Sequence, residues 1–167
     1  MKDKNTRKLV LSAMLAALVV AATMVVKIPS PTNGYVNLGD CFVLLAGWLL
    51  GPWYGGAAAG IGSMLTDLLS GYAHYAPGTL IIKGLDAVAA ALVFRSLGSH
   101  RAAPILSGIV GEIIMVVGYF GYSALLLGKG LAAALSIPGN LVQGAVGIIA
   151  GVLLLHVAQR AHLAEKI

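Results

Sequence analysis

Residues 37–83 read NLGDCFVLLAGWLLGPWYGGAAAGIGSMLTDLLSGYAHYAPGTLIIK, and this stretch decides how the rest of the chain is organised. It is mostly apolar, yet it contains Asp40, Asp67, His74 and Lys83. A charged side chain near the centre of a bilayer costs ~2.5–3.5 kcal/mol on insertion scales. Here the charges stand beside glycines, tyrosines and turn residues, so the stretch predicts a polar pocket at one face of a membrane.

The chain as a whole is strongly apolar. Of its 167 residues, 59% are hydrophobic and 10% are charged, whereas a soluble domain is about 25% charged. The composition predicts an integral membrane protein with a single domain over residues 1–167, and it leaves no polar stretch long enough for a soluble ATPase or kinase. Cys41 is the single cysteine, which excludes an internal disulfide and offers no Cys pair for a metal.

Six apolar runs predict an all-α membrane protein with six transmembrane helices, at residues 9–26, 40–51, 54–70, 78–97, 102–127 and 137–159. The second run is shorter than the ~20 residues that cross a bilayer. Gly51-Pro52 is therefore either a turn between two helices or a kink within one. The prolines and the Asn-Gly pair in residues 27–38 predict a loop.

The basic residues favour six helices over five. With six, the Lys and Arg residues on the side of the N-terminus number eight and those on the other side two, with Lys83 inside a span. With five helices the same residues divide evenly. Cytoplasmic loops carry the excess of Lys and Arg, so both termini are expected in the cytoplasm. This placement explains the net charge of +5 without nucleic acid as a partner.

The six-helix topology gathers polar residues near the outer face, with one acid deeper in the bundle. The candidate substrate-binding residues are Asn37, Asp40, Asp67, Tyr72, His74, Tyr75, Lys83, Glu112, Asn140 and Gln143. Together they suit a small, flat, polar heterocycle, because Tyr rings stack, amides read donor and acceptor edges, and a charged group fixes orientation. The segments 27–38 and 72–76 would close the cavity.

Structural alternatives stand beside this interpretation. Asp40 could cap the second helix, and Asp67 could form an ion pair with Lys83. Lys83 and Asp86 could instead neutralise each other three residues apart on one helix. His74 could be a solvated loop residue, and the tyrosines could anchor the membrane interface.

Motifs of membrane enzymes are missing. The chain has no HExxH, Walker A, CxxC or GxSxG sequence and no Cys/His cluster. We therefore expect neither catalytic activity nor a metal or other cofactor bound by this chain. Small residues recur at the spacing of packed helices, and Ala13, Ala17 and Ala21 form a stripe on the first helix that suits an external partner.

Several segments resemble the substrate-binding S component of energy-coupling factor (ECF) vitamin transporters, in the riboflavin-transporter-like group. They are SAMLAA at 12–17, YVNLGD at 35–40, LLGP at 49–52, GSMLTDLLSGY at 62–72 and PGTLIIKG at 77–84. The likeness covers essentially the whole chain and is strongest in residues 13–86.

The resemblance implies a subunit of a prokaryotic plasma membrane transporter that captures a vitamin or vitamin precursor at the outer face. Its partners would be a transmembrane coupling subunit, docked on Ala13, Ala17 and Ala21, and two cytoplasmic ATPases that hydrolyse ATP. The small number of aromatic residues in the expected pocket favours a single-ring cargo such as hydroxymethylpyrimidine or a pyridoxine-type vitamer over riboflavin. The alternatives are riboflavin as the cargo, or a self-sufficient carrier or channel.

Overall fold

The computed structural model describes residues 2–30 and 34–161 and is predominantly helical. It contains α1 (Lys2–Val25), α2 (Asp40–Leu69), α3 (Ala76–Leu97), α4 (Ala103–Gly121) and α5 (Ile137–Arg160). Two short strands, β1 (Lys27–Ser30) and β2 (Gly34–Asn37), connect α1 to α2. A π-helical turn, η1 (Tyr122–Leu126), and a 3-10 segment, η2 (Gly130–Ser136), connect α4 to α5.

Helix α2 is a helical hairpin, because the chain reverses at Gly51. Gly51 adopts φ +80°, a left-handed conformation that glycine tolerates at no steric cost, and Pro52 follows it. A Cβ added to Gly55 would lie 2.8 Å from the Cα of Gly47, so the arms 40–50 and 52–69 pack against each other. Of the two possibilities that the sequence left open, the structure shows the turn.

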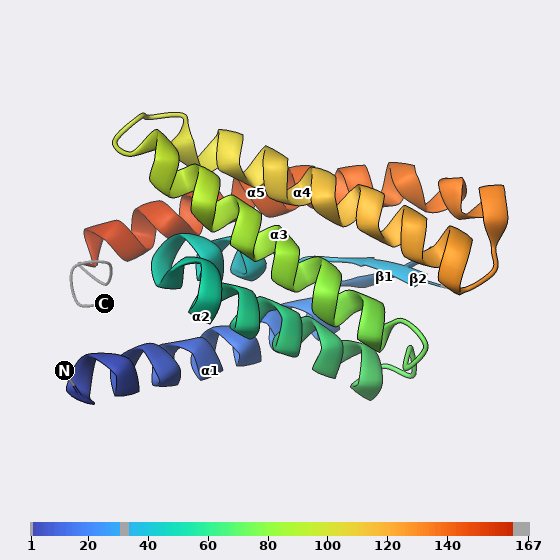
Figure 1. The fold of residues 1–167 in the computed structure, drawn as a ribbon, viewed down its shortest axis with the longest axis horizontal. Coiled ribbons are helices and arrows are strands. Elements are labelled where there is room, and N and C mark those ends of the chain that lie inside the picture. The colour runs from blue at the N-terminus through green and yellow to red at the C-terminus, as the bar shows by residue number, and fades with distance from the viewer. Residues whose placement is uncertain (1, 31–33, 162–167) are drawn as a thin grey trace.

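Figure 1 shows how the helices are arranged around this hairpin. The start of α1, the turn of α2, the α3–α4 connection and the end of α5 lie at one end of the bundle. The α2–α3 connection and the segments η1 and η2 lie at the other. The hairpin therefore brings Asp40 and Asp67, the two ends of α2, to the same end of the molecule.

The predicted loop at 27–38 was wrong over most of its length. Its residues pair as an antiparallel ribbon in which Ile28 lies opposite Val36 and Pro29 opposite Tyr35. Ile28, Val36 and Tyr35 are β-branched or aromatic residues, which suit a strand. Strand β2 contacts both α1 and α5, and the side chains of its residues 35–37 are partly buried.

Close backbone contact joins α2 to α3. A Cβ on Gly60 would lie 2.5 Å from the carbonyl oxygen of Leu80, so only a residue without a side chain allows this approach. The fully buried apolar side chains include Val19, Leu44 and Met115, which come from three different helices. Small residues thus set the helix spacing, and larger ones fill the remaining interior.

Some helix boundaries differ from those predicted. Helix α3 begins at Ala76 with Pro77 in its first turn, as expected. The predicted helix at 102–127 is regular only to Gly121, and η1 follows it. Within the described residues, four helical stretches are long and apolar enough to cross a membrane: Lys4–Val25, Asp40–Leu69, Ala103–Leu126 and Gly130–Arg160.

Candidate functional site

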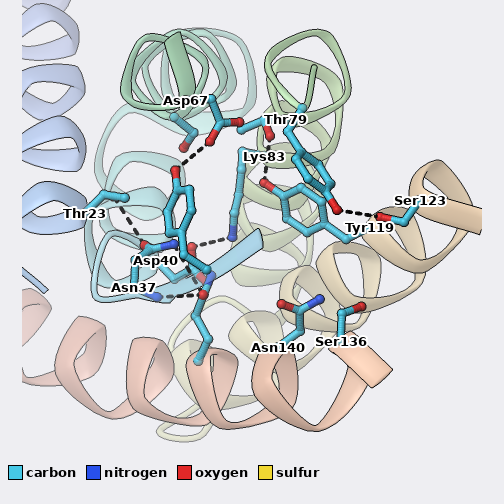
Figure 2. Close-up of a pocket in the computed structure, with 14 residues that line it drawn as sticks. Thr23, Asn37, Asp40, Asp67, Thr79, Lys83, Tyr119, Ser123, Ser136 and Asn140 are labelled. Atoms are coloured by element: carbon cyan, nitrogen blue, oxygen red, sulfur yellow. Dashed lines mark hydrogen bonds and ion pairs between the residues drawn. The ribbon is translucent and has the colours of Figure 1, made fainter. Parts of the chain in front are cut away.

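A polar pocket lies at the end of the bundle where the α2–α3 connection is found. About 620 Å³ of space lies between its walls, part of it open to solvent. Every helix contributes to it, as does β2. Its walls are formed by Thr23, Tyr35, Asn37, Asp40, Ser63, Asp67, Tyr75, Thr79, Lys83, Tyr119, Ser123, Ser136, Asn140 and Gln143 (Figure 2). Of the ten residues predicted to bind substrate, seven line this space: Asn37, Asp40, Asp67, Tyr75, Lys83, Asn140 and Gln143.

A continuous polar network forms one wall of the pocket. The ammonium of Lys83 pairs with the carboxylate of Asp40, and both side chains are almost completely buried. The Gln143 amide donates to the other Asp40 oxygen at 2.7 Å. The Gln143 carbonyl oxygen in turn accepts the backbone N–H of Asn37 at 2.8 Å. This network links α2, α3, β2 and α5.

The structural alternatives for Asp40 and Lys83 can now be compared with these contacts. Asp40 is the first residue of α2, but its carboxylate contacts Lys83 and Gln143. Lys83 also lies 3.6 Å from Asp86, so the expected pairing within α3 is present. An ion pair between Asp67 and Lys83 is absent from the described residues.

Asp67 instead contacts strand β2. The Tyr35 hydroxyl donates to Asp67 Oδ1 at 2.5 Å. Burial raises the pKa of the Tyr35 phenol, and the nearby Asp67 carboxylate raises this pKa further. The phenol therefore remains protonated and acts as a donor. The second oxygen, Oδ2, is buried and has no hydrogen-bond partner among the described residues. Asp67 therefore presents an unused acceptor at the wall of the pocket.

Aromatic hydroxyls form another part of the pocket wall. Tyr119 donates to Thr79 at 3.1 Å, and the hydroxyls of Tyr75 and Ser123 lie 3.2 Å apart. Lys129 donates to the Tyr75 hydroxyl at 2.7 Å. The ring centroids of Tyr75 and Tyr119 lie 6.4 Å apart, and Lys83 Nζ lies 5.9 Å from the Tyr119 ring. This wall can therefore offer both ring faces and hydroxyl groups to a ligand.

Two of the remaining predicted residues, Tyr72 and His74, lie outside the pocket wall. The Tyr72 ring is 4.9 Å from the Tyr35 ring, and Lys27 lies over both rings, at 5.5 and 5.3 Å. His74 is exposed, with its ring 4.7 Å from that of Tyr75. Tyr72 and His74 therefore lie outside the pocket, where their rings pack against the pocket-lining Tyr35 and Tyr75.

Glu112 is the third predicted binding residue that does not line the pocket, and its side chain is only 6% exposed. It lies at the base of an apolar groove between α4 and α5, which we call the α4–α5 groove. Apolar side chains of both helices, including Ile113, Val117 and Leu141, form this groove, and Asn140 lines it as well as the pocket.

Sequence reasoning missed half of the pocket residues: Thr23, Tyr35, Ser63, Thr79, Tyr119, Ser123 and Ser136. Helical spacing gave a signal for some of them. Ser63 precedes Asp67 by four residues and Thr79 precedes Lys83 by four, so each pair lies on one helix face. Tyr35 carried no such signal, because the strand that positions it was interpreted as a loop.

The alanine stripe of α1 lies away from this pocket. Ala13, Ala17 and Ala21 are all exposed, while Leu15 and Val19 on the other face of the helix are buried. A row of small exposed side chains leaves the helix backbone open to close approach by another helix.

Apolar helices of membrane-spanning length surround a polar pocket, and this combination is typical of multi-pass membrane proteins that bind a polar solute. The family model for the ECF-type riboflavin transporter S component matches residues 3–160. The chain belongs to this family, whose members are transporter components that bind vitamins and pair with membrane and ATPase modules, and not enzymes.

Individual proteins are also similar to this chain. The chain is 41% identical over 135 residues to an uncharacterized protein of Pyrococcus woesei, covering 80% of this chain and 88% of that protein. It is 30% identical over 151 residues to the thiamine precursor transporter HmpT of Lactococcus lactis subsp. cremoris, covering 89% and 86%. A solved S component of a bacterial ECF transporter shares the fold, with a TM-score of 0.72, 23% identity and coverage of 93% and 97%.

Proposed function

We propose that this S component captures a single-ring vitamin precursor, of the hydroxymethylpyrimidine or pyridoxine type, from the outer side of a prokaryotic plasma membrane. The observation that carries the proposal is the pocket, whose walls contain both a carboxylate oxygen without a hydrogen-bond partner among the described residues and tyrosine rings. The 30% identity to a thiamine precursor transporter supports a pyrimidine-type cargo in particular.

The walls suggest how such a ring would bind. Asp67 Oδ2 would accept an amino or ring N–H, which restores the hydrogen bond that this buried oxygen lacks. The Asn140 amide projects from α5 toward the same space (Figure 2) and can offer a donor and an acceptor. Tyr75 or Tyr119 would contact the ring face. Lys83 would not contact an anionic group, since Asp40 and Asp86 surround it.

Riboflavin is the second candidate cargo, and the name of the matching family favours it. Its three-ring system needs a longer aromatic slot than a single pyrimidine. Three tyrosines and no tryptophan or phenylalanine line the pocket, which supports the smaller ring.

We also propose six membrane crossings with both termini in the cytoplasm. The two arms of α2 and the four other helices give six helical segments that alternate in direction (Figure 1). The helix ends and connections on the side of the N-terminus carry most of the Lys and Arg residues. The pocket then opens at the outer face, and α3 crosses with Lys83 and Asp86 buried against its neighbours.

Transport would need other subunits. The stripe Ala13, Ala17 and Ala21 would dock on a transmembrane coupling subunit, and two cytoplasmic ATPases would hydrolyse ATP to drive release. This chain would bind no cofactor of its own. The exposure of the stripe supports its role in docking.

Mass spectrometry of ligand that co-purifies with the detergent-solubilised protein tests the cargo, followed by calorimetry with hydroxymethylpyrimidine, pyridoxine and riboflavin. A single-ring compound bound one to one, with binding weakened in Asp67→Asn, would agree with the proposal. Tight binding of riboflavin alone would identify riboflavin, and not a single-ring precursor, as the cargo. A protein that binds none of the three would remove the vitamin assignment.

A further inference from the structure

Three carboxyl groups meet beneath the pocket. Asp40 of α2, Asp86 of α3 and Glu112 of α4 each place an oxygen within 4.8 Å of the others, and we call them the carboxyl triad. Their exposed fractions are 1%, 0% and 6%. Lys83 supplies the positive charge at this position, through its pair with Asp40 and its approach to Asp86.

One lysine cannot balance three ionised carboxylates. Asp40 is satisfied by Lys83 and by the Gln143 amide. Neither oxygen of Asp86 or Glu112 has a hydrogen-bond partner in the part of the chain that the structure describes. A buried charge without adequate compensation costs several kcal/mol. The triad therefore requires positive charge in addition to Lys83.

The neighbouring side chains do not provide that charge. On α4, the Tyr119 ring lies 5.9 Å from Lys83 Nζ. On α5, Gln143 is neutral and also contacts the sulfur of Met115. On α2, Cys41 follows Asp40 directly. Among the described residues, these neighbours of the triad add hydroxyl, amide and thiol groups but no second cation.

Helix backbone fills the space around the triad. A Cβ on Gly147 would lie 2.7 Å from Asp40 Cβ and 3.2 Å from Glu112 Oε1, and one on Gly144 would lie 3.0 Å from Glu112. Asp86 lines neither the pocket nor the α4–α5 groove. Because Lys83 already bridges Asp40 and Asp86, little room is left for a further ion with its own coordination shell. A proton is the one cation that needs no added volume.

We propose that the carboxyl triad is a proton-binding site, with at least one proton held on Asp86 or Glu112. A protonated carboxyl can donate a hydrogen bond to its ionised neighbour, which satisfies oxygens that are otherwise unpartnered. The site lies directly below the pocket because Asp40 belongs to both. It does not depend on the identity of the cargo.

Unfolding of the ligand-free protein in detergent, followed across the neutral pH range, tests the site. The folded state holds a proton that an exposed carboxyl in the unfolded chain has released, so raising the pH should destabilise the fold. The unfolding equilibrium constant should rise by up to about tenfold per pH unit for each proton lost. Glu112→Gln is neutral and nearly isosteric, so it should fold and show a smaller pH dependence.

Infrared spectroscopy gives a direct second measurement. The carbonyl band of a protonated carboxyl should be present in the wild type and should weaken in Glu112→Gln or Asp86→Asn. In an Asp67→Asn background, Glu112→Gln should remove the same band, because Asp67 lies outside the triad. Two variants are included so that a folding defect in one does not remove the test.

Two results would overturn the proposal. One is an identical pH dependence and an unchanged carboxyl band in the wild type and both variants. The other is a stoichiometric metal ion, found by elemental analysis of the purified wild-type protein and lost in Glu112→Gln, which would mean that a metal supplies the charge.

Discussion

Lys83 of α3 pairs with Asp40, the first residue of α2, and not with Asp67 near the end of the same helix. The reversal at Gly51 brings both carboxylates to one end of the bundle, where the lysine contacts one and Tyr35 the other. The two acids thus differ in role. Asp40 is neutralised within the protein, whereas one oxygen of Asp67 has no hydrogen-bond partner among the described residues.

Removing the lysine should destabilise the protein. Lys83→Ala leaves Asp40 and the rest of the carboxyl triad without their cation, and breaking a buried ion pair typically costs about 3–5 kcal/mol. Thermal unfolding in detergent measures the loss. The double variant Asp40→Asn with Lys83→Met should recover part of it, because no unpaired charge is left at that pair. Equal stability of Lys83→Ala and wild type would mean that the pair contributes nothing.

Replacing Asp67 should affect ligand binding more than folding. Asp67→Asn keeps the shape and an acceptor for Tyr35 but removes the charge, and a hydrogen bond to a charged group contributes about 1.5–3 kcal/mol. Calorimetry should show roughly 10- to 100-fold weaker binding of the identified cargo. Wild-type affinity in both Asp67→Ala and Lys83→Ala would place the ligand elsewhere.

Bulky substitutions on the alanine stripe should separate binding from transport. Ala13→Trp or Ala17→Trp would hold a partner helix away from α1, since small residues permit close packing in lipid. Coupled uptake should be lost while calorimetry still shows wild-type affinity. Leu153→Trp on α5 is a matched control, since Leu153 is already 64% exposed. Normal uptake in the alanine variants would remove the proposed docking role.

The protein alone should not transport. Reconstituted into vesicles without partners, it should bind its cargo but accumulate none, and uptake should appear when the coupling subunit, the ATPases and ATP are added. Accumulation by the isolated chain would instead support the self-sufficient carrier.

Helix spacing should depend on Gly60. Gly60→Ala places a Cβ 2.5 Å from the Leu80 carbonyl oxygen, which belongs to backbone and cannot rotate away. Overpacking of this kind costs about 1–3 kcal/mol, measurable as a lower melting temperature. Gly121→Ala is the control, because nothing lies within 4 Å of its added Cβ. Similar melting of the two variants would contradict the close α2–α3 contact.

Much of the architecture was predictable because it depends on local chemistry. Apolar runs gave the helices, Pro77 lies in the first turn of α3 as expected, and the Gly51-Pro52 pair marked the turn of α2. The β1–β2 ribbon was missed because its strands are only four residues long and prolines interrupt the strand pattern. Contacts with α1 and α5 stabilise this ribbon. Tyr35 was missed for the same reason, because it lies on β2. Its partner Asp67 is 32 residues away in the sequence.

By itself, the sequence determined that the chain enters a membrane, where its helices run and which end gathers polar groups, because hydropathy and turn residues act over short distances along the chain. Only the tertiary structure decided which charges meet. Asp86, Asp67 and Asp40 lie 3, 16 and 43 residues from Lys83 in the sequence. The most distant of them, Asp40, is the partner because of how α2 and α3 pack. The same packing moved Glu112 out of the pocket and into the carboxyl triad. Such pairings depend on distances between helices, which glycine contacts across the bundle set and which no local pattern encodes.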